Sequence, residues 1–125
     1  MEECQEKRFE TSWYTFSKWG RSWWRNRKAC EYQGGYLVSI ETQEEWQFIN
    51  DEIQKRSSWN TSAWHIGLRF YNKTWTWLSG EKLNISKWRD SAKKGRAEIS
   101  KNESLFSKIS RSEINAFICE MPEGR

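Results

Sequence analysis

Three cysteines, Cys4, Cys30 and Cys119, set the first limit on how this 125-residue chain can fold. An odd number of cysteines in a secreted protein leaves one thiol without a partner in the same chain. Cys30 and Cys119 lie in segments that have the character of ordered structure, whereas Cys4 lies near the terminus, so we expect a Cys30–Cys119 disulfide. A bridge that closes a loop of about 90 residues contributes on the order of 4–5 kcal/mol to stability. Cys4 is then either a free thiol or a link between two copies in a homodimer.

Aromatic residues are abundant, with 10 Trp, 6 Phe and 4 Tyr. Each can bury roughly 150–250 Å², so we expect one domain with an aromatic core over residues 1–125, in which residues 1–10 form a stalk or an extension. The net charge of +4 arises from acidic and basic residues that are interspersed. This modest basicity, without a nucleic-acid-binding signature, predicts that nucleic acid is not the partner.

Four sequons for N-linked glycosylation favour an extracellular location. They begin at Asn60, Asn72, Asn84 and Asn102. No apolar run approaches the roughly 20 residues that span a membrane, and the polar start of the chain does not have the character of a signal peptide. We therefore expect a mature fragment, the ectodomain of a cell-surface membrane protein.

Two helices are predicted in the first half of the chain. Ser22 is a suitable N-cap for the first, which places Trp23, Asn26 and Cys30 on one face and ends at Gly34 and Gly35. The second begins at a capping box. Its cap is Thr42, its buried face carries Trp46, Ile49 and Ile53, its end lies near residues 55–56, and Phe48 lies beside that face against a neighbouring element.

Short strands are predicted around and after these helices. They cover residues 13–17, 36–40, 63–70, 74–78, 97–100 and 115–120. Two early helices followed by several short strands predict an α+β fold.

Several spaced segments, taken in order, resemble the C-type lectin-like domain family. They are Trp23 seven residues before Cys30, residues 34–40 (GGYLVSI), residues 65–68 (HIGL), Trp75 and Trp77 with Gly80, and residues 117–120 (FICE). The resemblance implies two helices, two small antiparallel sheets and a long loop region. It also implies that the family's invariant disulfide is Cys30–Cys119.

The departures from the family pattern indicate a divergent member. His65 stands where the family has tryptophan, so either Trp64 takes over the core position or His65 is half-buried. The second disulfide of the family is absent, since its expected positions near Arg96 and Arg111 carry no cysteine, and the long loop is expected to be more mobile. Trp13 stands where long-form members have a cysteine, which would make Cys4 its orphaned partner.

The sugar-binding members of the family use carboxylates and amides of two motifs, E-P-N or Q-P-D and W-N-D, to hold calcium and sugar together. Residues 89–96 (RDSAKKGR) and 106–113 (FSKISRSE) contain neither motif. The resemblance is strongest to the natural-killer-cell-receptor type, which implies a cell-surface protein ligand bound without calcium or another cofactor. A glycan bound at a non-standard or anion-recognising site, and a structural module of a larger extracellular protein, remain as alternatives.

Two cationic segments are candidates for the interaction surface. Arg89, Lys93, Lys94 and Arg96 form either a positive patch that attracts an acidic partner or sulfated glycan, or a solvated loop. Residues 18–28 interleave Trp with Arg and Lys, which is either core plus a solvated face or a dimer contact. A single histidine and the absence of a nucleophile or nucleotide motif argue against an enzyme.

Overall fold

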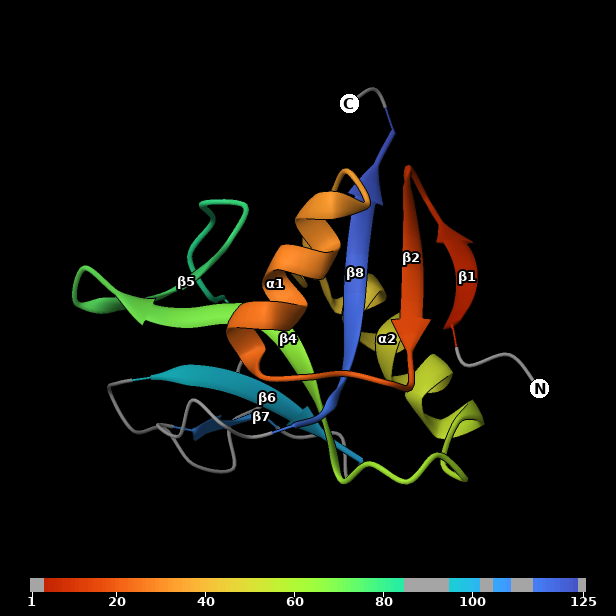
Figure 1. The fold of residues 1–125 in the computed structure, drawn as a ribbon. Helices are drawn as coiled ribbons and strands as arrows, with labels where there is room; N and C mark the ends of the chain where they lie inside the picture. The colour runs from red at the N-terminus through yellow and green to blue at the C-terminus, as the bar shows by residue number, and fades with distance from the viewer. Residues whose placement is uncertain (1–3, 85–94, 102–104, 109–113, 124–125) are drawn as a thin grey trace.

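The computed structural model describes residues 4–84, 95–101, 105–108 and 114–123 (Figure 1). The elements follow in the order β1 (Cys4–Phe9), β2 (Ser12–Ser17), α1 (Trp23–Tyr32), β3 (Tyr36–Leu37), α2 (Gln43–Lys55), β4 (Ala63–Tyr71), β5 (Thr74–Trp77), β6 (Arg96–Ser100), β7 (Leu105–Lys108) and β8 (Ala116–Pro122). The α+β class with two helices is therefore confirmed.

The strands form one mixed sheet in the order β1-β2-β8-β4-β6-β7, with β3 added to β8 and β5 added to β4. All these pairings are antiparallel except β4 with β8, which run parallel over Trp64↔Ala116 and His65↔Phe117. The two small antiparallel sheets expected from the family resemblance are thus joined into one by this short parallel contact. In Figure 1, α1 crosses in front of β4 and β8, and α2 lies behind β2 and β8.

The amino-terminal segment that was expected to be a stalk or an extension contains β1, which pairs with β2 along its whole length. In this register Arg8 lies opposite Trp13, and Cys4 lies opposite Ser17. Four residues of strand separate Arg8 from Cys4, about 13 Å, whereas bridged cysteines need Cα atoms within about 7 Å. The prediction that Cys4 is the orphaned partner of position 13 is therefore wrong.

Both helices begin at their predicted caps. The Ser22 hydroxyl accepts a hydrogen bond from the Arg25 amide, and α1 buries the predicted residues Trp23, Asn26 and Cys30. The Thr42 hydroxyl accepts one from the Glu45 amide at 3.0 Å. The Glu45 carboxylate does not complete the usual capping box with Thr42, because it accepts from the Glu41 amide one residue earlier, at 2.8 Å.

The disulfide between Cys30 and Cys119 is present, with 5.3 Å between the two Cα atoms, and it ties α1 to β8. A small cluster around it includes Trp23, Leu37 and Phe117, all buried. The main core lies between the sheet and α2, and much of it is aromatic, as the composition predicts. Phe48 of α2 stacks on Phe9 of β1 with 4.6 Å between ring centroids, which confirms its expected contact with a neighbour.

The backbone of β4 passes so close to the backbone at the end of β3 that residue 67 has no room for a side chain. A Cβ atom added to Gly67 would lie 2.3 Å from the carbonyl oxygen of Leu37. The Gly67 amide donates to the Val38 carbonyl at 2.8 Å, so β4 crosses directly over the end of β3. Because β3 contains residues 36–37 alone, the prediction of a strand over residues 36–40 is too long.

Candidate recognition site

A concave, cationic surface lies between α1 and the β4–β5 hairpin, and we call it the arginine–aromatic groove. It encloses about 330 Å³. Its walls are Trp23, Trp24, Arg27, Arg69, Phe70, Tyr71, Gly95 and Arg96. A volume near the lower end of the range for ligand pockets, roughly 300–1,000 Å³, fits a side chain or a small group of a larger partner.

The helix supplies one wall because of its local geometry. Trp23 is buried and its indole N–H donates to the Ile66 carbonyl of β4 at 2.8 Å, which fixes the helix against the strand. Arg27 follows one turn later, and its guanidinium carbon lies 5.8 Å from the Trp23 ring centroid and 5.2 Å from that of Trp24. The same hydrogen bond that positions α1 therefore positions its arginine at the groove.

The opposite wall is built by the β4–β5 hairpin, which turns through Asn72 and Lys73. Both have positive φ, 52° and 68°, as a two-residue type I′ turn requires. The turn keeps Arg69 and Tyr71 on the last residues of β4, with the Arg69 guanidinium carbon 4.6 Å from the Tyr71 centroid. The amide of Phe70 donates to the Gly95 carbonyl at 2.9 Å, which brings the start of β6 to the groove.

Arg69 and Arg96 lie directly opposite each other in the β4–β6 register. Like charges in this position lower the stability of a strand pair. Arg96 also lies over the Trp23 ring, with 4.8 Å to the centroid. Three guanidinium groups from α1, β4 and β6 thus line one hollow, and that of Arg27 is also paired with Glu31 at 3.3 Å.

The structure therefore places one of the four predicted patch residues, Arg96, at a concave cationic site. Arg89, Lys93 and Lys94 lie outside the described residues. Arg27 lies in the predicted 18–28 segment, whereas Arg69 was missed as a site residue, although the aromatic Phe70 follows it in the sequence. Their meeting with Arg96 depends on the packing of α1 against β4, which no local pattern reveals.

The structure also places the predicted glycosylation sites and the unpaired cysteine. Asn60, Asn72 and Asn84 are exposed, and Asn102 lies outside the described residues. Cys4 is exposed in β1 and has no disulfide partner within this chain, which agrees with a free thiol and with a link between two copies alike. In the part of the chain that the structure describes, no group of three or more His, Cys, Asp or Glu side chains is arranged to hold a metal ion. No helix among those same residues has the length and apolar character to cross a membrane.

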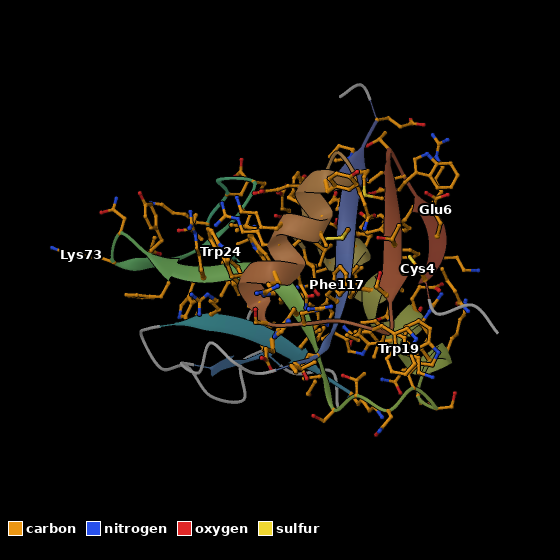
Figure 2. All side chains as sticks on the ribbon, viewed as in Figure 1. Cys4, Glu6, Trp19, Trp24, Lys73 and Phe117 are labelled. Carbon is orange, nitrogen blue, oxygen red and sulfur yellow. A yellow bond between two sulfur atoms is a disulfide. The ribbon has the colours of Figure 1, made fainter. Side chains whose placement is uncertain are left out.

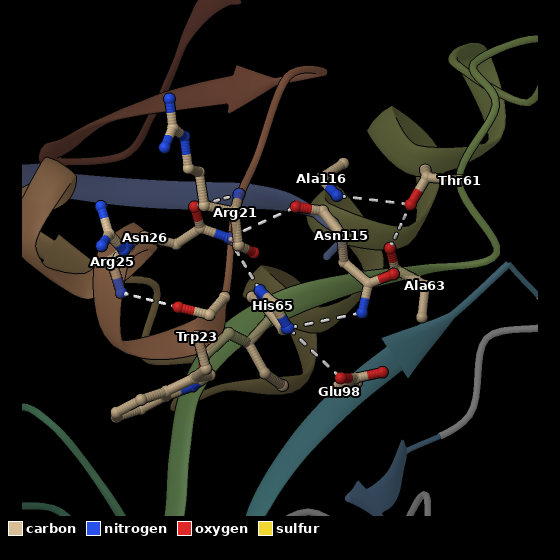
Figure 3. A network of polar contacts seen from close by, with 12 residues as sticks. Arg21, Trp23, Arg25, Asn26, Thr61, Ala63, His65, Glu98, Asn115 and Ala116 are labelled. Atoms are coloured by element: carbon tan, nitrogen blue, oxygen red, sulfur yellow. Dashed lines mark hydrogen bonds and ion pairs between the residues drawn. The ribbon is translucent and has the colours of Figure 1, made fainter. Parts of the chain in front are cut away.

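His65 lies at the centre of a buried polar network (Figure 3). It is 1% exposed and Trp64 is fully buried, so of the two alternatives the structure confirms that Trp64 takes the core position and excludes a half-buried His65. The Asn26 amide nitrogen lies 2.8 Å from Nδ1 of His65, and Glu98 Oε2 lies 3.3 Å from Nε2. Trp64 and His65 are neighbours on β4, so their side chains point to opposite faces of the strand, and both faces are buried there.

Asn26 fixes the orientation of this network. Its Oδ1 accepts from the Arg21 amide at 2.8 Å, so its Nδ2 is the donor toward the Arg21 carbonyl at 2.9 Å and toward His65 Nδ1. In the neutral ring the imidazole proton then lies on Nε2, facing Glu98. The network holds the loop before α1, β4 and β6 together and so supports the groove.

We expect Asn26→Ala to lower the free energy of unfolding by about 2 kcal/mol, because it leaves Nδ1 of the buried His65 without its hydrogen-bond donor and removes the two bonds to the Arg21 backbone. Urea denaturation of the oxidised protein measures this. Gln47→Ala is the control, since the Gln47 amide bonds Asp51 at an exposed site. Equal effects of the two substitutions would contradict the role assigned to the network.

A second buried polar cluster is formed by residues of β2, β8 and α2, and it contains two carboxyl groups. Burial, and then the nearby carboxylate of Glu45, raise the pKa of Glu120 to about 7. Burial is also the main cause that raises the pKa of Glu45. Tyr14 donates its hydroxyl to Glu45 at 2.6 Å, and Ser12 donates to Glu120 at 2.9 Å. These groups are packed inside the sheet and are not accessible to a ligand.

Comparison with known proteins supports the fold. The profile of the family described as Lectin C-type domain matches residues 20–121. Rheacalcin-1 of Rhea americana is 36% identical over 107 residues, which is 78% of each chain. The low affinity immunoglobulin epsilon Fc receptor of Mus musculus is 34% identical over 82 residues, which is 64% of this chain and 23% of that receptor.

A solved structure shares the fold at lower sequence identity. The Ca2+-independent C-type lectin SPL-2 from Saxidomus purpuratus aligns with a TM-score of 0.85 over 96% of this chain and 93% of its own, at 20% identity. Identity at this level supports the architecture and carries no residue roles.

Proposed function

Because the chain belongs to the C-type lectin domain family, we propose that it is an extracellular recognition domain that binds an acidic protein partner on a cell surface without calcium. The observation that carries the proposal is the convergence of Arg27, Arg69 and Arg96 on an aromatic-walled groove. Its relatives include lectins and receptors, so a binding role, rather than catalysis, suits the family.

The chemistry of the groove favours a carboxylate-bearing ligand. Arginine presents a planar fork of donors that matches a carboxylate, and its position against an aromatic ring limits the conformations that the side chain must lose on binding. Tyr71 is 56% exposed and Trp24 is 51% exposed, so both offer apolar area at the rim. Aromatic residues and arginine are the side chains that most often dominate the binding energy of protein interfaces.

Calcium independence rests on the ligand inventory. Calcium takes six to eight oxygen ligands, largely carboxylates and carbonyls. Residues 89–96 carry one carboxylate, Asp90, among four cations, and residues 106–113 also carry one, Glu113. A structure with this fold need not depend on the ion, since SPL-2 is a Ca2+-independent C-type lectin.

The second candidate is an anionic glycan at the same groove, since a sulfate or a sugar carboxylate offers the charge that the arginines bind. A structural role without a ligand is the third. We also propose that Asn60, Asn72, Asn84 and Asn102 are glycosylated, and that the domain is part of an ectodomain.

A tetramer of the glycosylated domain, used to stain cells, tests the proposal. We expect staining that a calcium chelator leaves unchanged and that protease treatment of the cells abolishes. Arg69→Glu combined with Arg96→Glu is expected to reduce staining at least tenfold, because two of the three groove cations become repulsive toward an acidic partner.

The matched control reverses two charges away from the groove, at Lys7 and Lys82, both exposed. It changes the net charge equally and should leave staining within about twofold. Loss of staining in chelator would overturn calcium independence. Staining that survives protease but is lost after glycosidase treatment of the cells would show that the ligand is a glycan. An equal loss of staining in the control variant would show that the effect comes from net charge and not from the groove.

A further inference from the structure

A second hollow lies on the other side of α1 from the groove, and we call it the two-indole hollow. It encloses about 590 Å³. Its walls are Trp19, Arg21, Trp24, Arg25, Asn26, Lys28, Ala29 and Phe117. In Figure 2 Phe117 lies between the two tryptophans, so the indoles border the hollow on either side of it. Trp24 separates it from the arginine–aromatic groove.

The charge of this hollow is of one sign. Arg25 and Lys28 lie on one face of α1, about 4.5 Å apart along its axis at 1.5 Å per residue, and Arg21 precedes the helix cap, so the three cations follow one another along the hollow. No carboxylate is among the described residues that line the hollow. The acidic group that approaches the row is Glu31, 3.7 Å from Lys28 and also bonded to Arg27.

The two indoles are far more exposed than core packing explains. Trp19 is 70% exposed and Trp24 is 51% exposed. Lys18 lies 5.1 Å from the Trp19 ring centroid, and Lys28 lies 5.2 Å from that of Trp24. Each end of the hollow therefore combines a flat apolar ring with a nearby cation.

We propose that the two-indole hollow binds a sulfated glycan chain. Sulfate groups would pair with Arg21, Arg25 and Lys28, and the apolar C–H faces of the sugar rings would stack on Trp19 and Trp24. A linear polyanion matches a row of cations, and the volume accommodates a short oligosaccharide segment.

Other classes of partner fit this hollow less well. An extended peptide would need an unpaired strand edge for its backbone hydrogen bonds, and the hollow is walled by α1, by the connection that precedes it and by Phe117. A membrane surface needs an apolar face that projects outward, whereas this surface is concave and bordered by cations. The inference is independent of the protein-binding groove, since the two hollows share Trp24 alone.

Titration of the folded, oxidised domain with a size-defined heparin oligosaccharide tests the site by calorimetry. The combined substitution Arg21→Ala, Arg25→Ala and Lys28→Ala is expected to weaken binding at least tenfold and to reduce its dependence on salt concentration. Trp19→Ala is expected to weaken binding about fivefold with the salt dependence unchanged, because it removes stacking and no charge.

The control removes three exposed lysines elsewhere, at positions 7, 73 and 82, and is expected to weaken binding less than threefold. Equal losses in the two triple variants, or no effect of Trp19→Ala, would overturn the proposal in favour of bulk electrostatics. Polyglutamate that binds as tightly, with the same sensitivity to the variants, would overturn it in favour of an acidic peptide. The Arg69→Glu and Arg96→Glu variant tests whether the two sites are separate. They are separate if this variant loses cell staining but still binds the heparin oligosaccharide, and if adding Trp19→Ala to it still weakens that binding.

Discussion

Replacing Cys30 and Cys119 together by alanine is expected to lower the free energy of unfolding by about 4–5 kcal/mol. The disulfide joins residues 89 positions apart, and its removal restores a large number of conformations to the unfolded chain. Domains of this size are stable by about 5–15 kcal/mol in total, so this loss is a large fraction of the stability of the domain. Both sulfur atoms are fully buried, and their loss adds a small cavity between α1 and β8.

Urea denaturation of the variant beside the oxidised wild-type protein measures this effect. Cys4→Ser is the control, because Cys4 is exposed and free, and we expect it to change the unfolding free energy by less than about 0.5 kcal/mol. A loss below about 1 kcal/mol in the double variant would show that packing of α1 on the sheet, and not the covalent tether, holds the two halves of the fold together.

The parts of the fold that follow from local patterns were predictable. The caps at Ser22 and Thr42 depend on side chains within three residues of the backbone atoms that they bind, so the sequence alone reveals them. The Cys30–Cys119 pair was predictable because it leaves out only the cysteine at the terminus. β1 was missed because its residues are polar and mostly exposed, so they carry no alternation that indicates a strand.

The candidate sites were predictable only in part, because they depend on contacts between distant segments. Arg96 was identified from the density of cations around it, but Arg69 reaches the same groove through the β4–β6 register. The sequence left open whether His65 is half-buried, since nothing local shows that Asn26, 39 residues earlier, supplies a hydrogen-bond partner on α1. A buried polar residue is acceptable to a core when such a partner exists.

The substitution Glu120→Gln changes the free energy of unfolding, and we expect this change to be about 3 kcal/mol more favourable at pH 8 than at pH 4.5. Burial, and then the Glu45 carboxylate, raise the pKa of Glu120 from 4.5 to about 7 in the folded protein. Each unit of this shift is worth about 1.4 kcal/mol. Glutamine keeps an oxygen to accept from the Ser39 amide and a side chain of the same shape beside Ser12, without the buried charge.

The direction of the pH dependence follows from which state binds the proton more tightly. Because the folded pKa is raised, the contribution of Glu120 to stability is complete below about pH 4.5, where both states are protonated, and is lost as the pH rises through about 7. The wild-type protein should therefore lose stability between pH 5 and 7.5, and the variant should lose much less. Glu45, whose pKa burial also raises, should leave a smaller dependence of stability on pH in the variant.

Urea denaturation at five pH values measures the difference in stability between wild type and Glu120→Gln, with the substitution Glu6→Gln at an exposed site as control. Parallel pH profiles for wild type and Glu120→Gln would show that the fold does not hold this carboxyl group protonated.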